Sequence, residues 1–416
     1  MLAAARTRLA PLVAMLLVAI LLGAPCVARA SVSQTDAIAG ATLADAPHVM
    51  AAAPDIDAPA GILETIDGRE LWSREADAER AMASTTKIMT AIVVLEQAPD
   101  LEQVVVVSAE AAKIGEAGID LEPGENLTVR ELLSAMLVHS ANDAAYALAQ
   151  HVAGGVDEFV QRMNDKAAEL DLDHTSFTNP HGLDEPGHYT SAADLATLAE
   201  YAMRIPLFRE LVGLRSTRIP APGGGTRLIE ASNKLIGTFD GATGVKTGWT
   251  SDAGYCLVAS AERGGIELVA VILGAETERQ RFDEAADLLE WGFEHYAVRE
   301  VSEAGAPVAR VPVSDYLDVT VAAMVAETTA TAVFDLAGEV TRRADVVGEV
   351  SAPVAEGDRL GTLTIRQGDR LLAQVPVVAA ADVAVPGFWE RIGIWFTRAW
   401  RGVFGGARQA EPVYVM

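Results

Sequence analysis

Two apolar runs near residue 260 restrict the folds that this chain can adopt. Residues 254–261 and 266–273 are each long and apolar enough to form a buried strand, and Gly264-Gly265 between them suits a tight hairpin turn. A second hairpin is predicted much earlier, where residues 61–66 and 70–74 flank a turn at Asp67-Gly68. Such strand pairs form an antiparallel sheet, and a sheet that is apolar on both faces has to be covered by other elements.

The segments between these hairpins have helical periodicity. Apolar side chains in residues 85–95 recur at helical spacing, and Thr128 with Glu131 has the pattern of a capping box that opens another helix. Residues 143–153 are predicted to form a further helix, which ends at a pair of glycines, and residues 281–293 are helical in pattern again. The predicted fold class is therefore α+β, an antiparallel sheet with helices packed on it.

The predicted secondary structure changes along the chain. After about residue 294 helical periodicity ends, and short strands alternate with turns. We predict a signal peptide at residues 1–30, a flexible leader at 31–58, the α+β domain at 59–293, an all-β domain at 294–384, an amphipathic helix at 385–404 and a tail at 405–416.

The first thirty residues have the pattern of an export signal. Arg6 and Arg8 precede an uncharged apolar run at residues 9–22, and Ala28 and Ala30 form the small-x-small pattern of a signal peptidase site. The run is shorter than the ~20 residues of a membrane span. An uncleaved N-terminal anchor is the alternative. We predict an exported protein.

The cysteines are few. Cys26 falls within the predicted signal, so the mature chain keeps Cys256 and can form no internal disulfide. Cys256 lies in an apolar run and is predicted to be a buried structural thiol rather than a nucleophile.

The chain is strongly acidic. Its 32 Lys and Arg and 58 Asp and Glu give a net charge of −26, and loss of residues 1–30 leaves 29 basic against 58 acidic residues, a net charge of −29. A surface of this charge repels phosphate groups, so we predict no nucleic-acid partner.

Residues 387–404 form an amphipathic pattern near the C-terminus. On a helical wheel one arc of roughly 140° is apolar. It holds Phe388, Trp389, Ile392, Trp395, Phe396, Ala399, Trp400 and Val403. The other side holds Glu390, Arg391, Thr397, Arg398 and Arg401, with Ile394 as the exception. Such a helix is predicted to lie in the plane of a membrane interface; docking on the protein's own β domain is the alternative.

Three short motifs carry the chemistry. Ser84-Thr85-Thr86-Lys87 is an S-x-x-K, Ser140-Ala141-Asn142 is an S-x-N, and Lys246-Thr247-Gly248 is a K-T-G. Each has another interpretation when taken singly: an N-cap serine, a loop that caps the next helix, and an exposed strand lysine. Three matches in this order favour nucleophilic acyl transfer.

The spacing assigns a role to each motif. Residues three apart at the start of a helix share a face, so Lys87 can take the proton of the Ser84 hydroxyl. Burial and a second cation, Lys246, would keep the Lys87 amine neutral. Ser140 would relay a proton to the leaving amine while Asn142 holds the substrate amide.

The K-T-G segment precedes the late hairpin, where an edge strand can pair with an extended peptide. Gly248, which has no side chain, would let the substrate backbone approach closely. The backbone N–H groups of Ser84 and Trp249 are the candidate oxyanion donors.

Together these motifs make the sequence resemble the low-molecular-mass penicillin-binding proteins, the serine D-alanyl-D-alanine carboxypeptidases. Further matching stretches lie at residues 121–125, 159–167, 179–184, 188–192 and 284–293, and Ala352-Pro353-Val354 resembles the family's C-terminal β domain. Two positions depart from the family pattern: Ala141 replaces the commoner glycine, and Met82 stands near Ser84 where proline is usual.

The resemblance implies a penicillin-recognising transpeptidase or β-lactamase-like fold with Ser84 as nucleophile and Lys87 as general base, and with Ser140 and Asn142 as the second motif. It implies that Lys246 and Thr247 bind the terminal carboxylate of the substrate. Arg281, with Arg279 as the fallback, resembles the family arginine that helps to hold this carboxylate.

The implied substrates are peptidoglycan stem peptides, and the implied inhibitors are β-lactams. The reaction needs no cofactor or metal. The protein would work at the periplasmic face of the cytoplasmic membrane, held peripherally by residues 387–404. His174, His181 and His188 recur every seven residues but lack zinc-ligand spacing, so we predict satisfied loop histidines.

Three alternative functions stay open. A D,D-endopeptidase would cut peptidoglycan crosslinks, although such relatives usually lack the β domain. A serine β-lactamase needs a carboxylate that activates water, for which Glu185 is the candidate, without its usual sequence context. A non-catalytic wall-binding protein would not need Ser84 and Lys87 together.

Overall fold

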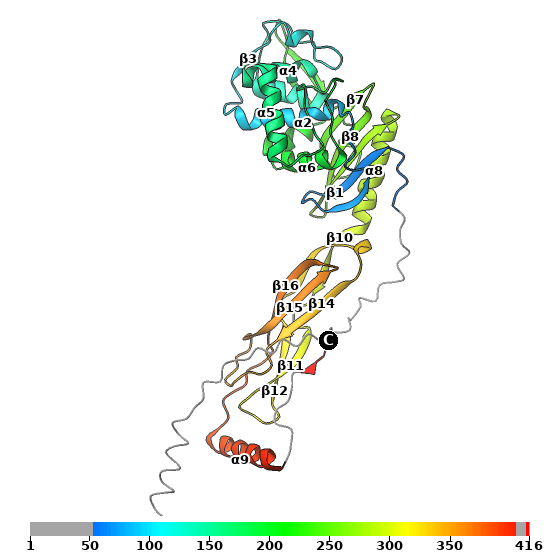
Figure 1. Cartoon of the computed structure of the whole chain (residues 1–416). Helices are drawn as coiled ribbons and strands as arrows, with labels where there is room; N and C mark the ends of the chain where they lie inside the picture. Colours follow the sequence, from blue (N-terminus) through cyan, green and yellow to red (C-terminus); the bar gives the residue numbers. More distant parts are fainter. Residues whose placement is uncertain (1–52, 405–412, 416) are drawn as a thin grey trace, which may run out of the picture. The chain divides into compact units, whose positions relative to one another are not determined.

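The computed structural model describes residues 53–404 and 413–415, which fall into two compact units (Figure 1). In the described part of the chain, one unit comprises the residues up to Arg299 together with Ala330–Glu339. The other comprises Glu300–Thr329 and the residues from Val340 onward. The predicted signal peptide with Cys26, most of the predicted leader and residues 405–412 of the predicted tail lie outside the described residues.

An antiparallel sheet organises the first unit. Its strands follow the order β2-β1-β9-β8-β7, so the two predicted hairpins join into one sheet. The strands are β1 (Ala60–Thr65), β2 (Glu70–Arg74), β7 (Ala242–Thr250), β8 (Gly254–Arg263) and β9 (Ile266–Ala275). Gly264 and Gly265 both have positive φ in the turn between β8 and β9, as a tight hairpin requires. Strand β7 stands at one edge of the sheet.

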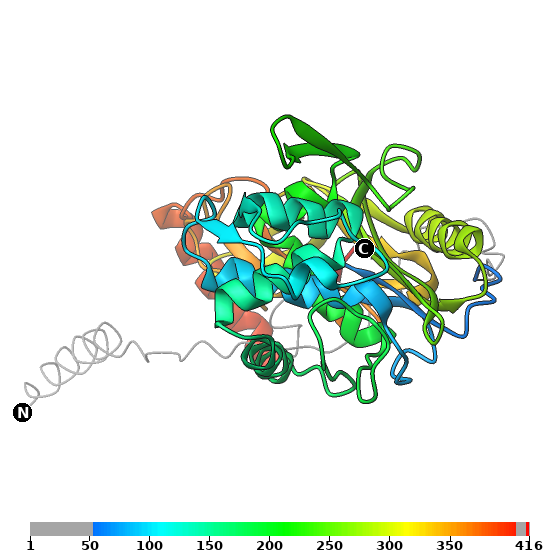
Figure 2. The ribbon, with the colours of Figure 1, turned by 90° about the horizontal axis from the view of Figure 1, so that it is seen from above.

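Helices cover both faces of this sheet, and Figures 1 and 2 show α8 on the side opposite α2 and α4. The helical elements are η1 (Ala83–Thr86), α2 (Lys87–Gln97), η2 (Ala111–Lys113), α3 (Val129–Ser134), η3 (Ala135–His139), α4 (Asn142–Ala153), α5 (Val156–Glu169), α6 (Ala192–Met203), α7 (Pro206–Val212) and α8 (Glu278–His295). Two small hairpins accompany them: β3 (Val104–Val106) with β4 (Asn126–Thr128), and β5 (Ser216–Pro220) with β6 (Thr226–Glu230).

Alternation along the central strands creates two cores. On β9, Val269 and Val271 pack with α2 and α4, whereas Leu268 and Ile272 pack with α8. Both faces of the strand are therefore buried, which explains its unbroken apolar sequence. The predicted α+β fold class is confirmed.

The predicted helix boundaries also hold near the S-x-N motif. Thr128 and Glu131 form the complete capping box of α3. The helix widens into one π-helical turn at η3 and breaks at Ser140, and α4 ends at Gly154 in the left-handed conformation.

The second unit is built on a six-stranded sheet with the order β14-β15-β16-β12-β11-β17. Its elements are β11 (Pro307–Pro312), β12 (Thr320–Val325), β14 (Val340–Val346), β15 (Arg359–Gln367), β16 (Arg370–Ala379), α9 (Phe388–Phe404) and β17 (Val413–Tyr414). A separate pair joins β10 (Tyr296–Ser302) to β13 (Thr329–Phe334), which η4 (Asp335–Ala337) follows. Nearly all of β13 and the whole of η4 belong to the first unit. The predicted C-terminal helix is thus present as α9. No helix in residues 53–404 or 413–415 is long and apolar enough to cross a membrane.

Candidate active site

The S-x-x-K motif straddles the junction of η1 and α2. Ser84 lies in the 3-10 turn and Lys87 is the first residue of the α-helix, so the two side chains are one turn apart. The Lys87 Nζ to Ser84 Oγ distance is 2.7 Å. This is the contact that the spacing predicted.

The Lys87 amine is fully buried and has two further partners. Its Nζ donates to Asn142 Oδ1 at 2.6 Å and to the His181 backbone carbonyl at 2.5 Å. Burial and the neighbouring Lys246 hold the pKa of Lys87 well below its usual range, while Asp143 and Glu116 oppose the shift. Lys246, the second amine expected from the K-T-G motif, therefore lies close enough to lower the pKa of Lys87.

No motif in the sequence assigned a role to the His181 carbonyl. Residues 179–184 matched the family, but a backbone oxygen leaves no mark on a residue pattern. In the structure, Asn179 Oδ1 accepts from the N–H groups of His181 and Gly182 and so shapes this turn. The turn places a third acceptor beside Lys87.

Gly182 and Gly248 allow two other segments of the chain to pack directly against the Ala83–Ser84 backbone. A Cβ on Gly182, where φ is +91°, would lie 2.0 Å from the Ala83 carbonyl oxygen. A Cβ on Gly248 would lie 3.1 Å from the Ser84 nitrogen. Gly248 was expected to make room for the substrate; the structure shows that it also makes room for the Ser84 segment itself.

Strand β7 carries the K-T-G motif along the side of this site. Lys246 is buried, its Nζ donates to the Thr247 carbonyl at 2.9 Å, and burial together with Arg281 lowers its pKa to about 7. The Thr247 hydroxyl lies 2.8 Å from Ser232 Oγ. Sequence reasoning missed Ser232, because a lone serine in a polar loop carries no signal.

The two candidate arginines lie in different surroundings. Arg281 is buried, donates from Nη1 to the Gly248 carbonyl at 2.8 Å, and packs its guanidinium over the Tyr255 ring at 5.3 Å. Arg279 has an 88% exposed side chain and pairs with Asp283. The structure therefore brings Arg281, and not Arg279, to the K-T-G strand.

The S-x-N motif lies at the break between η3 and α4. Ser140 is buried in the left-handed conformation with φ +77°, a strained backbone for a residue with a side chain. Its hydroxyl makes no hydrogen bond to another residue in the described part of the chain. Ala141 has φ −61° and ψ 116°, which any residue adopts, so alanine in place of glycine causes no strain.

Asn142 is held from the neighbouring loop. Its backbone N–H donates to the Ala117 carbonyl at 2.7 Å, and its side-chain Nδ2 donates to the Gly115 carbonyl at 3.0 Å. The amide oxygen is thereby turned towards Lys87. Asn142 thus contacts the amine that the sequence assigned to the base.

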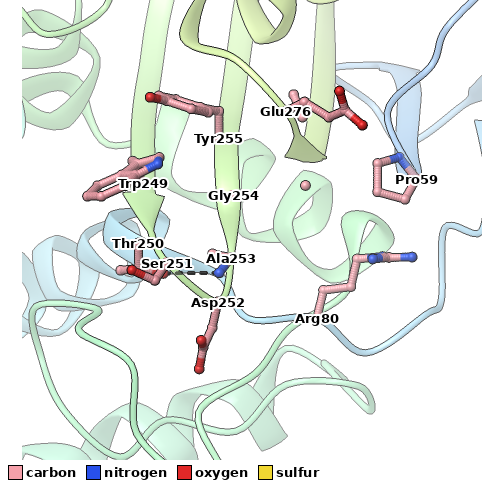
Figure 3. Close-up of a pocket in the computed structure, with 12 residues that line it drawn as sticks. Pro59, Arg80, Trp249, Thr250, Ser251, Asp252, Ala253, Gly254, Tyr255 and Glu276 are labelled. Atoms are coloured by element: carbon pink, nitrogen blue, oxygen red, sulfur yellow. Dashed lines mark hydrogen bonds between the residues drawn. The ribbon is translucent and has the colours of Figure 1, made fainter.

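A cavity of about 400 Å³ lies around the tip of the β7–β8 hairpin, as Figure 3 shows. Trp249 and Tyr255 line one side of it, with ring centroids 5.9 Å apart, and Arg80, Asp252 and Glu276 also border it. The Trp249 side chain is about half exposed. Ser84 and Lys87 do not line this cavity.

The remaining candidates are structural. Cys256 is buried, as predicted, its Sγ lies 3.7 Å from the Ala253 carbonyl oxygen, and burial raises its pKa to about 11. The His188 ring bonds to the Thr178 N–H and the Thr86 hydroxyl. Burial lowers the pKa of His181 to about 3 and that of His188 to about 4. Among the described residues no group of His, Cys, Asp and Glu is arranged to hold a metal ion.

Comparison with known proteins agrees with this geometry. Residues 48–277 match the model of the D-alanyl-D-alanine carboxypeptidase family, and residues 296–385 match that of the penicillin-binding protein 5 C-terminal domain. The D-alanyl-D-alanine carboxypeptidase DacF of Bacillus subtilis is 33% identical over 335 residues, which are 79% of this chain and 86% of that protein.

DacC of Escherichia coli, also a D-alanyl-D-alanine carboxypeptidase, is 32% identical and covers 82% of this chain and 88% of its own. The crystal structure of the carboxypeptidase DacD from Francisella tularensis superposes with a TM-score of 0.62 at 27% identity, over 83% of this chain and 98% of that one. With its three motifs assembled around Lys87 and a family match over more than half of its length, this chain belongs to the low-molecular-mass penicillin-binding proteins of the D-alanyl-D-alanine carboxypeptidase family.

Proposed function

We propose that this chain is a serine D-alanyl-D-alanine carboxypeptidase, which removes the terminal D-Ala from peptidoglycan pentapeptide stems through an acyl-enzyme on Ser84. The observation that carries the proposal is the buried Lys87 amine, 2.7 Å from Ser84 Oγ. A serine hydroxyl is a weak nucleophile until a base takes its proton, and an amine can do so only when it is neutral. Burial and Lys246 hold the pKa of Lys87 well below its usual range, which favours that neutral form.

The three partners of Lys87 suit this role in both protonation states. A charged amine has three N–H donors, one each for Ser84 Oγ, Asn142 Oδ1 and the His181 carbonyl. A neutral amine keeps two donors and gains a lone pair. If Asn142 and His181 retain the two donors, the lone pair faces the Ser84 hydroxyl. The proton can then move between serine and lysine without rearrangement of the site.

The edge position of β7 supports the binding of an extended peptide. The strand has β8 on one side, and a substrate backbone can pair with the other. Lys246 and Thr247, with Arg281 beside them, are the groups that would hold the terminal carboxylate. The N–H groups of Ser84 and Trp249 would then stabilise the oxyanion, since Gly248 brings β7 next to the Ser84 nitrogen.

The proposed reaction has two steps, acylation of Ser84 and hydrolysis of the acyl-enzyme. Ser84 Oγ attacks the carbonyl carbon of the penultimate D-Ala while Lys87 takes the hydroxyl proton, and the C–N bond breaks as that proton passes, through Ser140, to the leaving D-Ala amine. Water then gives one proton to Lys87 and its hydroxyl oxygen to the acyl carbon. The ester bond to Ser84 Oγ breaks, Lys87 returns the proton to that oxygen, and the shortened stem leaves. With a β-lactam, Ser84 Oγ would attack the carbonyl of the ring amide. The ring would open, and the adduct would stay attached to Ser84.

The β-lactamase alternative is not favoured by the position of Glu185. This exposed carboxylate accepts hydrogen bonds from the Thr178 hydroxyl and the Asn179 amide, each at 3.1 Å, and contacts neither Ser84 nor Lys87. It therefore has no contact through which to activate water at the acyl carbon.

The test measures chemistry and adduct on the same protein. The full chain in detergent is incubated with a pentapeptide stem and, separately, with benzylpenicillin; we expect D-alanine release and a covalent adduct on Ser84, both lost in Ser84→Ala. Absence of any adduct on wild-type Ser84 would refute the proposal. Faster cleavage of crosslinked dimers than of pentapeptide would favour the endopeptidase, and rapid penicillin turnover the β-lactamase.

We further propose that α9 holds this exported protein peripherally on the periplasmic face of the cytoplasmic membrane. Its apolar arc is turned to the solvent: Trp389, Trp395 and Trp400 are 80%, 61% and 67% exposed. Two of its arginines contact its own β unit instead. Arg398 Nη2 donates to the carbonyls of Ser314 and Tyr316, and Arg401 pairs with Asp318 at 3.7 Å. An exposed aromatic face on a short amphipathic helix suits the headgroup region of a bilayer.

The alternative is a helix docked on its own β domain. The polar face of α9 makes such contacts, through Arg398 and Arg401, while the tryptophans stay exposed. The membrane proposal is tested by sedimentation with vesicles of zwitterionic and of anionic lipid. Replacing Trp395 and Trp400 by serine should abolish sedimentation with the vesicles. Arg398→Gln should still sediment with them, because the apolar face is unchanged. Binding that survives the loss of both tryptophans would contradict the proposal.

A further inference from the structure

The loop between β3 and β4, which includes residues 114–121, lies beside the active site but contains none of the motif residues. Its central residue, Ile119, is held through both its backbone N–H and its backbone carbonyl. The Ile119 N–H donates to Asp143 Oδ2 at 3.1 Å, and the Ile119 carbonyl accepts from Arg227 Nη1 at 2.7 Å. We call Asp143, Ile119 and Arg227 the Ile119 clamp.

Asp143 forms the inner half of the clamp. It follows Asn142 in the first turn of α4 and is buried. Its Oδ2 also accepts the Leu121 N–H at 3.1 Å, and its Oδ1 accepts the Ala144 N–H at 2.8 Å. A Cβ on Gly118 would lie 3.1 Å from the same carboxylate, so the loop backbone approaches it closely. The buried anion is satisfied entirely by backbone donors.

Arg227 forms the outer half from a different part of the chain. It lies on β6, and its Nη2 pairs with Glu125 Oε1 at 2.5 Å. The two side chains are only 15% and 7% exposed, so solvent screens the pair weakly. Because Glu125 ends the same loop, the β5–β6 hairpin fixes the loop at two points.

The clamp connects to the chemistry through Asn142. The loop segment before Ile119 supplies the Gly115 and Ala117 carbonyls that hold the Asn142 side chain and backbone. Asn142 Oδ1 in turn accepts from Lys87. A shift of the loop therefore moves an acceptor of the general base.

We propose that Asp143 and Arg227 are positioning residues for acyl transfer, which hold Ile119 from both sides and thereby fix Asn142 against Lys87. The inference rests on the proposed function, because it assigns the base to Lys87. Neither residue contacts Ser84 Oγ. A displacement of about 1 Å at a reacting group can cost on the order of 100-fold in rate, so small loop movements are enough to matter.

Asp143 has a second, electrostatic consequence. Its carboxylate and that of Glu116 raise the pKa of Lys87, against burial and Lys246. The buried rings of His181 and His188 also lie near this amine. Asp143→Asn keeps an oxygen acceptor for the loop but removes the charge. The acid limb of the acylation rate should then move to lower pH, since a larger fraction of Lys87 is neutral.

The experiment measures the acylation rate constant of the full chain in detergent with a fluorescent penicillin, across pH, beside thermal unfolding. Arg227→Gln should lower the rate roughly 10-fold or more at every pH without moving the acid limb. Asp143→Asn should move that limb to lower pH. If Arg227→Gln does not fold, Arg227→Lys, which keeps one contact, takes its place with a smaller loss.

The matched control is Arg209→Gln. Arg209 pairs with Glu267 and Glu262, each at 2.8 Å, in the same unit and makes no contact with the 114–121 loop. It should lower stability without lowering the acylation rate of the folded protein. Clamp variants that acylate within twofold of wild type, with an unmoved acid limb, would overturn the inference. Absence of acylation in wild type would instead overturn the proposed function.

Discussion

Gly182 is the position where a single added methyl group should disable the nucleophile. In Gly182→Ala the new Cβ would lie 2.0 Å from the Ala83 carbonyl oxygen, 2.5 Å from its carbon and 2.9 Å from the Ser84 nitrogen. Contacts below 3.0 Å are essentially never seen for a real Cβ, so the Ala83–Ser84 peptide has to move by about 1 Å. A movement of this size corresponds to roughly 100-fold in rate, or about 2.7 kcal/mol of transition-state stabilisation.

The left-handed backbone adds a separate cost. Gly182 has φ +91°, and a side chain in left-handed conformations costs about 1–2 kcal/mol of folding stability. Gly154→Ala is the control for this cost alone, because Gly154 has φ +81° at the end of α4 with nothing within 4 Å of its Cβ position. Both variants should lose stability, but only Gly182→Ala should lose acylation.

The assay is the rate of fluorescent penicillin attachment to Ser84, with thermal unfolding to set the folded fraction. If folded Gly182→Ala acylates within threefold of Gly154→Ala, the Ala83–Ser84 backbone is not held as described. The reasoning from close backbone approach would then be refuted.

Three further predictions address individual side chains. Arg281→Gln should raise KM for the stem peptide about 10- to 100-fold, the value of a charge-assisted hydrogen bond, whereas exposed Arg279→Gln should change KM less than twofold in the same steady-state assay. Ala141→Gly should leave acylation within twofold, because Ala141 has ordinary dihedral angles. Burial and the neighbouring Glu64 raise the pKa of Glu200 to about 8, so this carboxyl stabilises the fold fully below its unfolded pKa of about 4.5 and loses that contribution as the pH rises through 8. Thermal unfolding against pH should show this loss in wild type and a flatter curve in Glu200→Gln; identical curves would contradict it.

Much of the fold could be predicted because its signals are local. The hairpin turns at Gly264-Gly265 and Asp67-Gly68 and the capping box at Thr128 lie where the residue pattern indicated, since each depends on the conformational preferences of a few neighbouring residues. The pattern did not indicate that the early and late hairpins join through β1 and β9, because nothing local encodes which strands pair across two hundred residues.

In the candidate site too, some features could be predicted from local sequence and others could not. The S-x-x-K, S-x-N and K-T-G patterns named the side chains, while Ser232, the His181 carbonyl and the Ile119 clamp went unnoticed. Backbone carbonyls and N–H groups are present at every residue, so their use leaves no trace in composition or spacing. The sequence left two arginines, Arg281 and Arg279, as candidates for the same role. In the structure Arg281 is buried beside the K-T-G strand, whereas Arg279 is exposed.

By itself the sequence determined that Ser84 and Lys87 lie one helical turn apart, because helix geometry brings residues at this spacing together wherever the helix forms. The tertiary structure decided the direction in which the pKa of that lysine moves. Its amide acceptor comes from 55 residues away and its carbonyl acceptor from 94 residues away, and the charge that lowers its pKa comes from Lys246 on β7. Exclusion of water and the proximity of a second charge are properties of packing between distant segments, and these set the pKa on which the chemistry depends.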